Sequence, residues 1–265
     1  MTKALFITSV VFVSLMFCGC AVNPVTGQNQ LMLISPAQES QIGAQYAPEI
    51  EKQLGGRIEN KTLQNYINGV GRNISRISHM PDLDFSYVAL ESDIVNAMAL
   101  PGGYVFITKG MLEKLDSEAQ LAAILAHETA HVTARHSAQA MTTQIGMNII
   151  LSTVSQKTSA GAMDIARIGS QLIGLKYSRE HETQADTVGL DYLVKAGYAP
   201  FAAVETMEML QKQNEVRPIE FFSSHPNPGN RKEILLRQIN LRAYPKNLKI
   251  ARSDYHRYVL TNLDD

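Results

Sequence analysis

One short segment of the sequence, His127-Glu128-Thr129-Ala130-His131, combines residue types and a spacing that suit metal chemistry. On a helix, residues four apart lie on one face about one turn apart, so both imidazoles can reach one tetrahedral zinc ion. Glu128 is rotated by about 100° from His127, which places its carboxylate beside the metal as a general base for water. The neighbouring residues are mostly Ala, Leu and Ile, which predicts a buried helix. Two incidental histidines and a glutamate would be costly there without a role.

A zinc site of this kind needs a third protein ligand, and the sequence offers two candidates. His136 lies nine residues after His127, or about 900° around a continuous helix, which is the opposite face. We therefore predict that His136 is not a ligand but a polar residue at the surface or behind the ligands. Glu182 and Asp186 share one face of another predicted helix, so Glu182 can bind the metal while Asp186 accepts the distal N–H of a ligand histidine. Taken alone, this pair is equally consistent with an ordinary charged helix face.

The composition limits what else the chain can be. The net charge of the 265 residues is −1 and the isoelectric point is about 6.7, which gives no electrostatic argument for nucleic acid as a partner. Hydrophobic residues make up 45%, enough for a sizeable core. Both cysteines, Cys18 and Cys20, lie near the start, so the body has neither a disulfide framework nor a cysteine-ligated metal site. A transition-metal site must be built from His and carboxylate side chains.

The N-terminal segment predicts export. Lys3 supplies a positive charge, an apolar stretch follows, and Gly19 precedes Cys20 as a small residue precedes the lipidated cysteine of a bacterial lipobox. The alternatives are a signal peptide cleaved nearby or a single membrane anchor, although residues 4–22 are barely long enough to span a bilayer. Ala21 is not the aspartate that retains such lipoproteins at the inner membrane, so we expect an outer-membrane anchor facing the periplasm.

Beyond this segment the hydrophobic pattern predicts a mainly helical α+β chain with a small antiparallel sheet. Ser117, with Gln120 three residues later, predicts a capped helix start ahead of the His-Glu-x-x-His segment. Residues 141–176 predict two helices with a flexible join at 155–161. Further helices are predicted over residues 36–53, 61–78, 179–196, 201–213 and 230–241, and strands over 83–89, 96–99 and 104–108.

Four stretches together resemble the M48 zinc metallopeptidases, the family that includes the Ste24 and HtpX proteases, and most of all their bacterial lipoprotein branch. The His-Glu-x-x-His motif alone is shared by many zinc peptidases, but the combination is specific. The resemblance covers roughly residues 35–242. The four stretches are residues 96–103, 127–131, 178–186, and 224–226 with Arg231.

The resemblance implies a zincin-like domain of the gluzincin type, with one Zn²⁺ ion per chain. His127, His131 and Glu182 would bind the zinc, with Asp186 behind them, and the loop residue His225 would donate to the oxyanion. The alternative for His225 is a structural loop histidine. The resemblance also implies an edge strand, to which an extended peptide substrate can add; the alternative is a turn between strands. The residues of that substrate-binding strand are Asn96, Ala97, Met98 and Ala99.

These observations predict a zinc-dependent endopeptidase that hydrolyses envelope proteins, especially misfolded or misassembled ones. Its expected partners are polypeptide substrates, the membrane through the lipid anchor, and envelope assembly machinery. The alternative is a zinc-containing lipoprotein that acts mainly as an outer-membrane assembly chaperone or scaffold. An intact Glu128 argues against that alternative, because a purely structural zinc site needs no general base.

The predicted organisation is a signal peptide with lipobox over residues 1–20, a tether over 21–34, and the peptidase domain over 35–265. Residues 141–176 join the two zinc-binding helices in the sequence, so they must start and end near the metal. We therefore predict a latent resting enzyme, in which this segment covers the cleft and His225 lies near the metal. The alternative is a plain helical hairpin that packs against the core.

Overall fold

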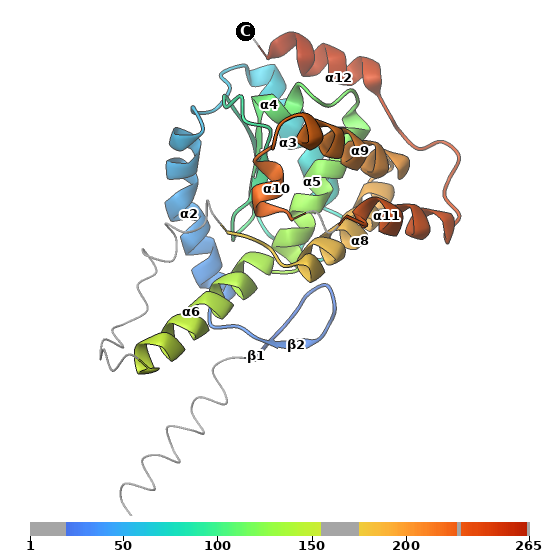
Figure 1. Ribbon diagram of the computed structural model, residues 1–265. Coiled ribbons are helices and arrows are strands. Elements are labelled where there is room, and N and C mark those ends of the chain that lie inside the picture. Colours follow the sequence, from blue (N-terminus) through green and yellow to red (C-terminus); the bar gives the residue numbers. More distant parts are fainter. Residues whose placement is uncertain (1–19, 155–174, 227–228, 264–265) are drawn as a thin grey trace, which may run out of the picture.

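The computed structural model describes residues 20–154, 175–226 and 229–263, in which helices surround a small sheet (Figure 1). The mainly helical α+β class predicted from the sequence is confirmed. In chain order the elements are β1 (Cys20–Val22), β2 (Asn29–Leu31), α2 (Pro36–Gln53), α3 (Lys61–Ser75), β3 (Ser86–Leu90), β4 (Ala97–Ala99), β5 (Tyr104–Thr108), α4 (Lys109–Leu112), α5 (Glu118–Thr133), α6 (His136–Val154), α8 (Arg179–Lys195), α9 (Phe201–Val216), α10 (Phe221–Ser224), α11 (Arg231–Asn240), α12 (Arg252–Tyr258) and the 3-10 helix η2 (Leu260–Asn262).

The sheet differs from the antiparallel one predicted. Its strand order is β3-β5-β4, with β4 antiparallel and β3 parallel to β5. Gly102 and Gly103, with φ of 80° and 95°, form the tight turn between β4 and β5. The returning strand then inserts between β4 and β3, which makes it parallel to β3. Alternating hydrophobicity located the strands, but it carries no information about the direction of a partner.

The core helix α5 begins where its N-cap was predicted. The Ser117 hydroxyl accepts a hydrogen bond from the backbone N–H of Gln120. The reciprocal half of the capping box is shifted, because the Gln120 side chain accepts from the N–H of Asp116 and not from that of Ser117. Almost every residue of α5 is buried. The helix packs against α8, α3, α9 and the sheet, so it forms the centre of the molecule (Figure 1).

Helix α8 crosses α5 at close range because small residues lie at the crossing. Ala185 is fully buried there. Gly189, one turn further on, approaches more closely: a Cβ atom added to it would lie 3.1 Å from the Cα of His127. This contact fixes the carboxylates of α8 directly opposite the histidines of α5.

The segment predicted as a tether, residues 21–34, is folded in the structure. Strands β1 and β2 form an antiparallel pair. The Asn23 amide donates to the carbonyl of Ala134 at 3.2 Å, and the N–H of Leu33 donates to the Thr142 hydroxyl at 3.1 Å. These contacts attach the hairpin to the junction of α5 and α6.

Two other predictions fall largely outside the described residues. The signal segment lies there except for Cys20. The flexible join at 155–161 also lies there, together with most of the segment that follows α6. Helix α6 itself starts next to α5 and runs away from the body of the molecule (Figure 1). The predicted cover over the cleft therefore remains a prediction.

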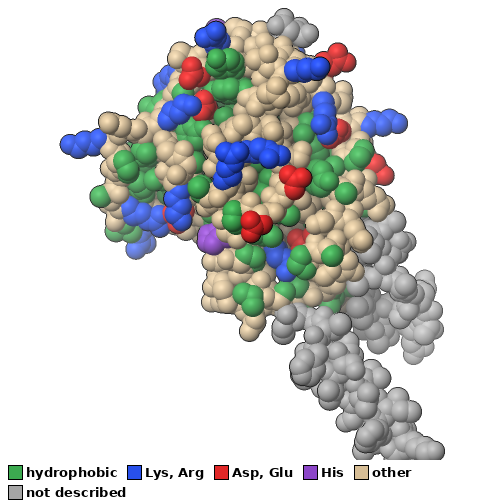
Figure 2. Space-filling view, turned by 180° about the vertical axis from the view of Figure 1, so that it is seen from behind, with side chains coloured by type: hydrophobic (Ala, Val, Ile, Leu, Met, Phe, Trp, Pro, Cys, Tyr) green, Lys and Arg blue, Asp and Glu red, His purple; other side chains and the backbone are tan. Residues whose placement is uncertain are grey.

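No helix within the described ranges is long and apolar enough to cross a membrane. On the face seen in Figure 2, basic and acidic side chains are interspersed, in keeping with the net charge of −1.

Four of the seven histidines are buried, which is unusual for a residue that is normally half-exposed and points to a role in the interior.

Two glycines of α3 provide a test of how tightly this helix packs on the sheet. A Cβ atom at Gly71 would lie 2.2–2.5 Å from the buried ring of Tyr87, whereas one at Gly69 would meet nothing within 4 Å. We expect Gly71→Ala to lower the free energy of unfolding by about 1–3 kcal/mol through overpacking. Gly69→Ala should be neutral or raise it by roughly 0.5–1 kcal/mol, because alanine favours a helix. Urea denaturation of the two variants checks this, and equal effects would contradict the packing described.

Candidate metal centre

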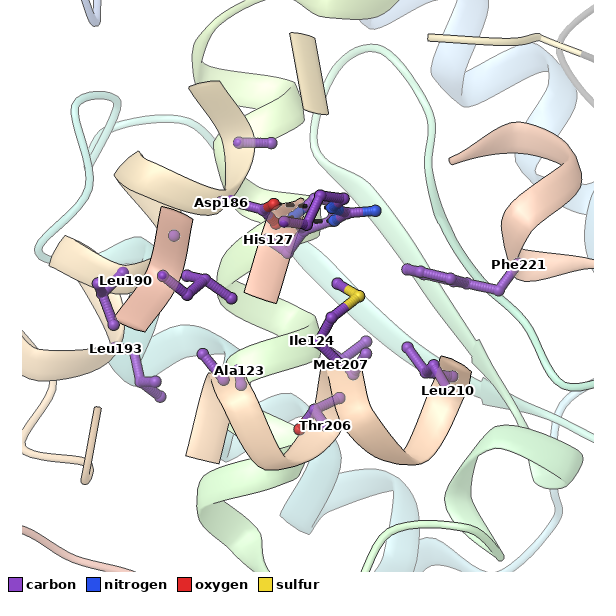
Figure 3. A pocket seen from close by; sticks show the side chains of 15 residues that line it. Ala123, Ile124, His127, Asp186, Leu190, Leu193, Thr206, Met207, Leu210 and Phe221 are labelled. Atoms are coloured by element: carbon purple, nitrogen blue, oxygen red, sulfur yellow. Dashed lines mark hydrogen bonds and ion pairs between the residues drawn. The ribbon is translucent and has the colours of Figure 1, made fainter. Parts of the chain in front are cut away.

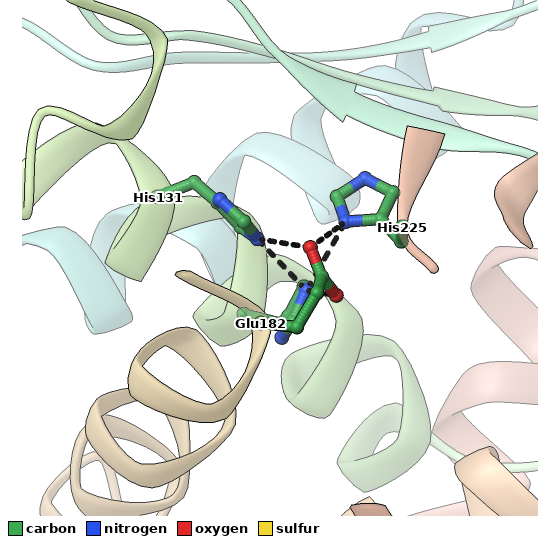
Figure 4. A group of neighbouring side chains, drawn as sticks. His131, Glu182 and His225 are labelled. Atoms are coloured by element: carbon green, nitrogen blue, oxygen red, sulfur yellow. Dashed lines mark hydrogen bonds and ion pairs between the residues drawn. The ribbon is translucent and has the colours of Figure 1, made fainter. Parts of the chain in front are cut away.

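Four buried side chains from three elements meet at one point of the described structure. His127 and His131 come from α5, Glu182 comes from α8, and His225 follows α10. One possible ligand atom from each lies within 4.8 Å of those of the others. Figure 4 shows the Glu182 carboxylate between His131 and His225. The structure thus brings together the histidine pair and the carboxylate that the sequence singled out, and His225, the other candidate, lies beside them.

The distances within this group favour a cation at its centre. The Nε2 atoms of His127 and His131 face each other at 3.1 Å. Glu182 Oε1 lies 3.4 Å from His131 Nε2 and 3.1 Å from His225 Nδ1. Imidazole nitrogens that face one another and a carboxylate cannot all be satisfied by hydrogen bonds. They are, however, the donor set that zinc binds in tetrahedral sites, so the residues present fit the metal that the motif implies.

The charges around His127 show the same preference for a cation. Burial by itself would lower the pKa of His127, but hydrogen bonds to Asp186 and Glu182 outweigh it and raise the pKa to about 9. In the protein alone, the carboxylates therefore draw a positive charge to this point. A metal ion would meet the same demand and would displace the proton.

Glu128 lies beside the ligand group without belonging to it. Its side chain is fully buried, and neither carboxylate oxygen has a hydrogen-bond partner among the described residues. Oε1 lies 3.5 Å from Nε2 of His225. Burial raises the pKa of the Glu128 carboxyl above its ordinary value. A carboxyl group in this setting is suited to take up and return a proton.

Asp186 lies behind His127 and is itself held by Arg231. The distance from His127 Nδ1 to Asp186 Oδ1 is 3.1 Å. Arg231 donates to both oxygens of Asp186 at 2.7 Å and lies 2.9 Å from Glu182. Burial alone would raise the pKa of Asp186, but Arg231 and His127 outweigh it and hold the pKa below the ordinary range. An ionised Asp186 keeps the proton of His127 on Nδ1 and leaves Nε2 free for a metal.

Figure 3 shows His127 and Asp186 at the wall of a cavity lined mostly by apolar side chains, among them Leu190, Met207 and Phe221. Its volume is about 30 Å³. That is room for little more than one water molecule, so this cavity is too small to hold a substrate.

The position of His136 corrects one step of the sequence analysis. Arg135 has a φ of 58° and ends the α5 run, so α6 starts in a new direction at His136. The ring of His136 is therefore fully buried next to His131, with Nδ1 3.0 Å from Nδ1 of that residue, and does not lie on the opposite face. His136 is not part of the ligand group within the described residues. Burial lowers its pKa to about 3, so it is neutral.

Two residues near the group were missed by sequence reasoning. Gln184 accepts from Nε2 of His136 at 2.9 Å. The ring of Tyr177 lies over the ring of His131 with the centroids 4.0 Å apart. The backbone N–H of Tyr177 donates to the carbonyl of Ser224. The sequence pointed to Arg231 only as part of a family stretch and predicted no role for it. A polar residue two positions after Glu182 is a weak signal, and the tyrosine that directly precedes residues 178–186 carries none by itself.

The predicted substrate strand is present as β4, at one edge of the sheet. The N–H of Phe221 donates to the carbonyl of Val95 at 3.2 Å, which holds α10 against the start of this strand. A crevice of about 20 Å³ between the strand and the His225 loop is lined by Asn96, Met98 and Tyr177, among others. The edge strand therefore borders the candidate metal centre, and its binding of a substrate stays a prediction.

Comparison with known proteins assigns the chain to a family. Residues 61–239 match Peptidase family M48. The beta-barrel assembly-enhancing protease of Escherichia coli (strain K12) is 30% identical over 223 residues, which cover 78% of this chain and 45% of that protein. The mitochondrial metalloendopeptidase OMA1 of Schizosaccharomyces pombe is 32% identical over 217 residues, covering 78% and 63%. The metalloprotease LoiP of Escherichia coli (strain K12) is 24% identical over 210 residues, covering 76% and 81%.

The chain belongs to peptidase family M48, and the family predicted from the four sequence stretches is confirmed. The chain spans about half the length of the beta-barrel assembly-enhancing protease that it matches.

Arg231 should be essential to the stability of the metal centre. It is 1% exposed and faces two buried carboxylates, whereas its neighbour Lys232 lies at the surface in an ion pair with Glu208. We expect Arg231→Met to lower the free energy of unfolding by about 3–5 kcal/mol, because Asp186 and Glu182 lose their guanidinium partner. Lys232→Met should cost no more than about 1 kcal/mol. Urea denaturation measures both, and a loss below 1 kcal/mol for Arg231→Met would contradict this description of the network.

Proposed function

We propose that this member of peptidase family M48 is a zinc-dependent endopeptidase with one Zn²⁺ ion per chain. The proposed ligands are His127, His131 and Glu182. The observation that carries the proposal is their convergence within 4.8 Å next to the buried Glu128. Three protein ligands leave a further position at zinc for substrate or water, which distinguishes catalytic from structural sites.

The residues around the ligand group can perform peptide hydrolysis. When bound, zinc supplies a Lewis acid that polarises a carbonyl group and lowers the pKa of water. Glu128 takes the proton from the attacking water and delivers it to the amine that leaves. The raised pKa of its buried carboxyl favours this return of the proton. His225, whose Nε2 faces Glu128, donates a hydrogen bond to the oxyanion that forms on the carbonyl.

The proposed substrate lies along β4 as an additional strand. Asn96, Ala97, Met98 and Ala99 would offer backbone groups to an extended peptide. This mode of binding reads the backbone more than the side chains, so it suits a protease of broad specificity. It also requires an unfolded or exposed segment, because a peptide within a folded domain cannot form a strand here. Misfolded or misassembled proteins provide such segments.

The two nitrogens of His225 support a latent resting state. Nδ1 lies 3.1 Å from Glu182 and 3.4 Å from His127, so it points into the ligand group, while Nε2 points to Glu128. With Nδ1 in the fourth ligand position, water and substrate would be excluded. Withdrawal of the His225 loop would open that position and leave the three helix-borne ligands in place. The same histidine could then serve the oxyanion.

The proposed location is the periplasmic face of the outer membrane, with a lipid anchor on Cys20 after cleavage of the signal peptide. The sequence of the first twenty residues supports it. The proposed role is quality control of envelope proteins, in contact with the machinery that assembles them. This role is supported by the name of one relative, a beta-barrel assembly-enhancing protease.

The competing function is that of a zinc-containing lipoprotein that acts mainly as an assembly chaperone or scaffold. Such a protein would use its zinc only to hold the helices together. Glu128 disfavours this, because a fully buried carboxyl group with no hydrogen-bond partner among the described residues destabilises the fold, and a purely structural zinc site does not need it.

The base is tested by Glu128→Gln. This change leaves the three proposed ligands intact, so zinc content should match that of the wild type, whereas peptide hydrolysis should fall by about 10²–10⁴-fold. Glu182→Ala is the matched comparison and should lower both zinc content and activity. Metal analysis and a peptidase assay with and without a chelator measure the two effects. Full activity in Glu128→Gln would exclude Glu128 as the base.

The lipid anchor is tested by Cys20→Ser. We expect this variant to move from the membrane fraction to the soluble periplasmic fraction, because it lacks the thiol that carries the lipid. Cys18→Ser removes the other cysteine and should stay with the membrane. A Cys20→Ser protein that remains membrane-bound would show that the apolar segment is itself an anchor.

A further inference from the structure

Three hydrogen-bonded side chains, His131, His136 and the partly buried Gln184, lie in a row on the side of His131 opposite the ligand group. Nδ1 of His131 lies 3.0 Å from Nδ1 of His136, and Nε2 of His136 lies 2.9 Å from the amide oxygen of Gln184. His131 and His136 are both fully buried. The function proposed above uses neither His136 nor Gln184.

Gln184, the last of the three side chains, determines which ring nitrogens of the two histidines carry protons. The amide oxygen of Gln184 can only accept a hydrogen bond, so Nε2 of His136 must carry a proton. A neutral imidazole carries one proton, so Nδ1 of His136 is an acceptor. Nδ1 of His131 must then be the donor between the two rings. The remaining nitrogen of His131, Nε2, therefore has a lone pair.

That lone pair lies at the centre of the ligand group, where Nε2 of His131 faces Nε2 of His127 at 3.1 Å. If these hydrogen bonds ran in the opposite direction, His131 could not bind a metal ion through Nε2. If Nδ1 of His136 carried the proton, Nδ1 of His131 would accept it and Nε2 would carry a hydrogen. A protonated Nε2 cannot bind a metal ion.

We propose that His136 is a positioning residue which, together with Gln184, holds His131 in the tautomer that binds zinc. The proposal rests on the zinc site proposed above and assigns it a second support, besides Asp186 behind His127. Asp186 fixes its histidine with a charge, whereas the support of His131 is a neutral relay. The turn at Arg135 makes this relay possible, because it brings His136 back against His131.

The relay is tested by two substitutions of His136 that separate hydrogen bonding from packing. In His136→Asn the Oδ1 atom takes the place of Nδ1, one bond beyond Cγ, and can accept from His131. In His136→Leu a carbon atom takes that place, and the buried volume is filled with an apolar group. If His136 only packs, leucine should be tolerated better than asparagine.

The readout is the zinc dissociation constant of the full-length protein, measured by competition with a chromogenic chelator. We expect His136→Leu to weaken zinc binding by roughly 10–100-fold, the range found when such supporting groups are removed. His136→Asn should stay within about threefold of the wild type, because an acceptor that holds the tautomer is retained. Equal affinity in the leucine variant and the wild type, or weaker binding by asparagine than by leucine, would overturn the proposal.

The far end of the relay is tested at Gln184. Gln184→Glu keeps an oxygen acceptor and should retain zinc binding, whereas Gln184→Met has no comparable acceptor and should weaken it. Thr183→Glu adds the same negative charge one residue earlier on α8 and controls for long-range attraction of the metal. If the glutamate and methionine variants of Gln184 bind zinc equally, the relay does not extend to this residue.

A spectroscopic measurement identifies the tautomer directly. In the zinc-loaded protein labelled with ¹⁵N-histidine, the signal that disappears in His136→Asn belongs to His136. We expect a protonated Nε2 and an unprotonated Nδ1, and the reverse pattern would overturn the proposal. The experiments distinguish a failure of the proposed zinc-dependent function from a failure of the proposed role of His136 and Gln184. A wild-type protein that binds no zinc would overturn the proposed function and the relay together, whereas equal zinc binding by all variants would overturn the relay alone.

Discussion

The structure depends on the balance of charge in a centre from which water is excluded. Glu128, Glu182 and Asp186 are buried there together, and the Arg231 guanidinium contacts the last two. Isolated carboxylates in such surroundings are strongly destabilising. One guanidinium compensates one of the three, so a divalent cation brings the sum to zero while the histidines stay neutral. The same balance explains why the site is built from imidazoles: they add ligands without adding charge.

Balanced charges stabilise the centre only if the charged groups and the ligands lie in contact, and the backbone brings them together. The crossing at Gly189 lets α8 approach the backbone of α5 at His127. Helical spacing then places Glu182 and Asp186 on the face of α8 that looks toward His127. Arg231 contacts both carboxylates and ties them to α11. His127, His131 and Glu182 are therefore fixed by α5, α8 and α11, and small residues at the helix contacts matter as much as the charged ones.

The local parts of this arrangement could be predicted from the sequence, because helical spacing alone determines them. Two residues four apart lie on one face of a helix. This spacing was sufficient to predict that His127 lies beside His131 and that Glu182 lies beside Asp186. The prediction for His136 relied on α5 continuing, and nothing in the sequence marks its end. A residue with positive φ after a helix is usually Gly or Asn, but here it is Arg135. Its conformation is held from a distance: its guanidinium donates to Glu39 and to the carbonyl of Ile34. Contacts so remote in sequence leave no local signal, and the same is true of the parallel pairing of β3 with β5.

The members of the ligand group differ in how firmly they are held, and this difference bears on how such a centre can be both stable and reactive. His127 and His131 lie within a helix of 16 residues and Glu182 within one of 17. His225 follows a helix of only four residues. Hydrogen bonds from Phe221 to Val95 and from Tyr177 to Ser224 attach this short segment to its surroundings. Moving it therefore breaks far fewer contacts than moving either long helix. In the proposed mechanism that asymmetry lets the fourth position open for a substrate on β4, while the charge balance that stabilises the centre is left intact.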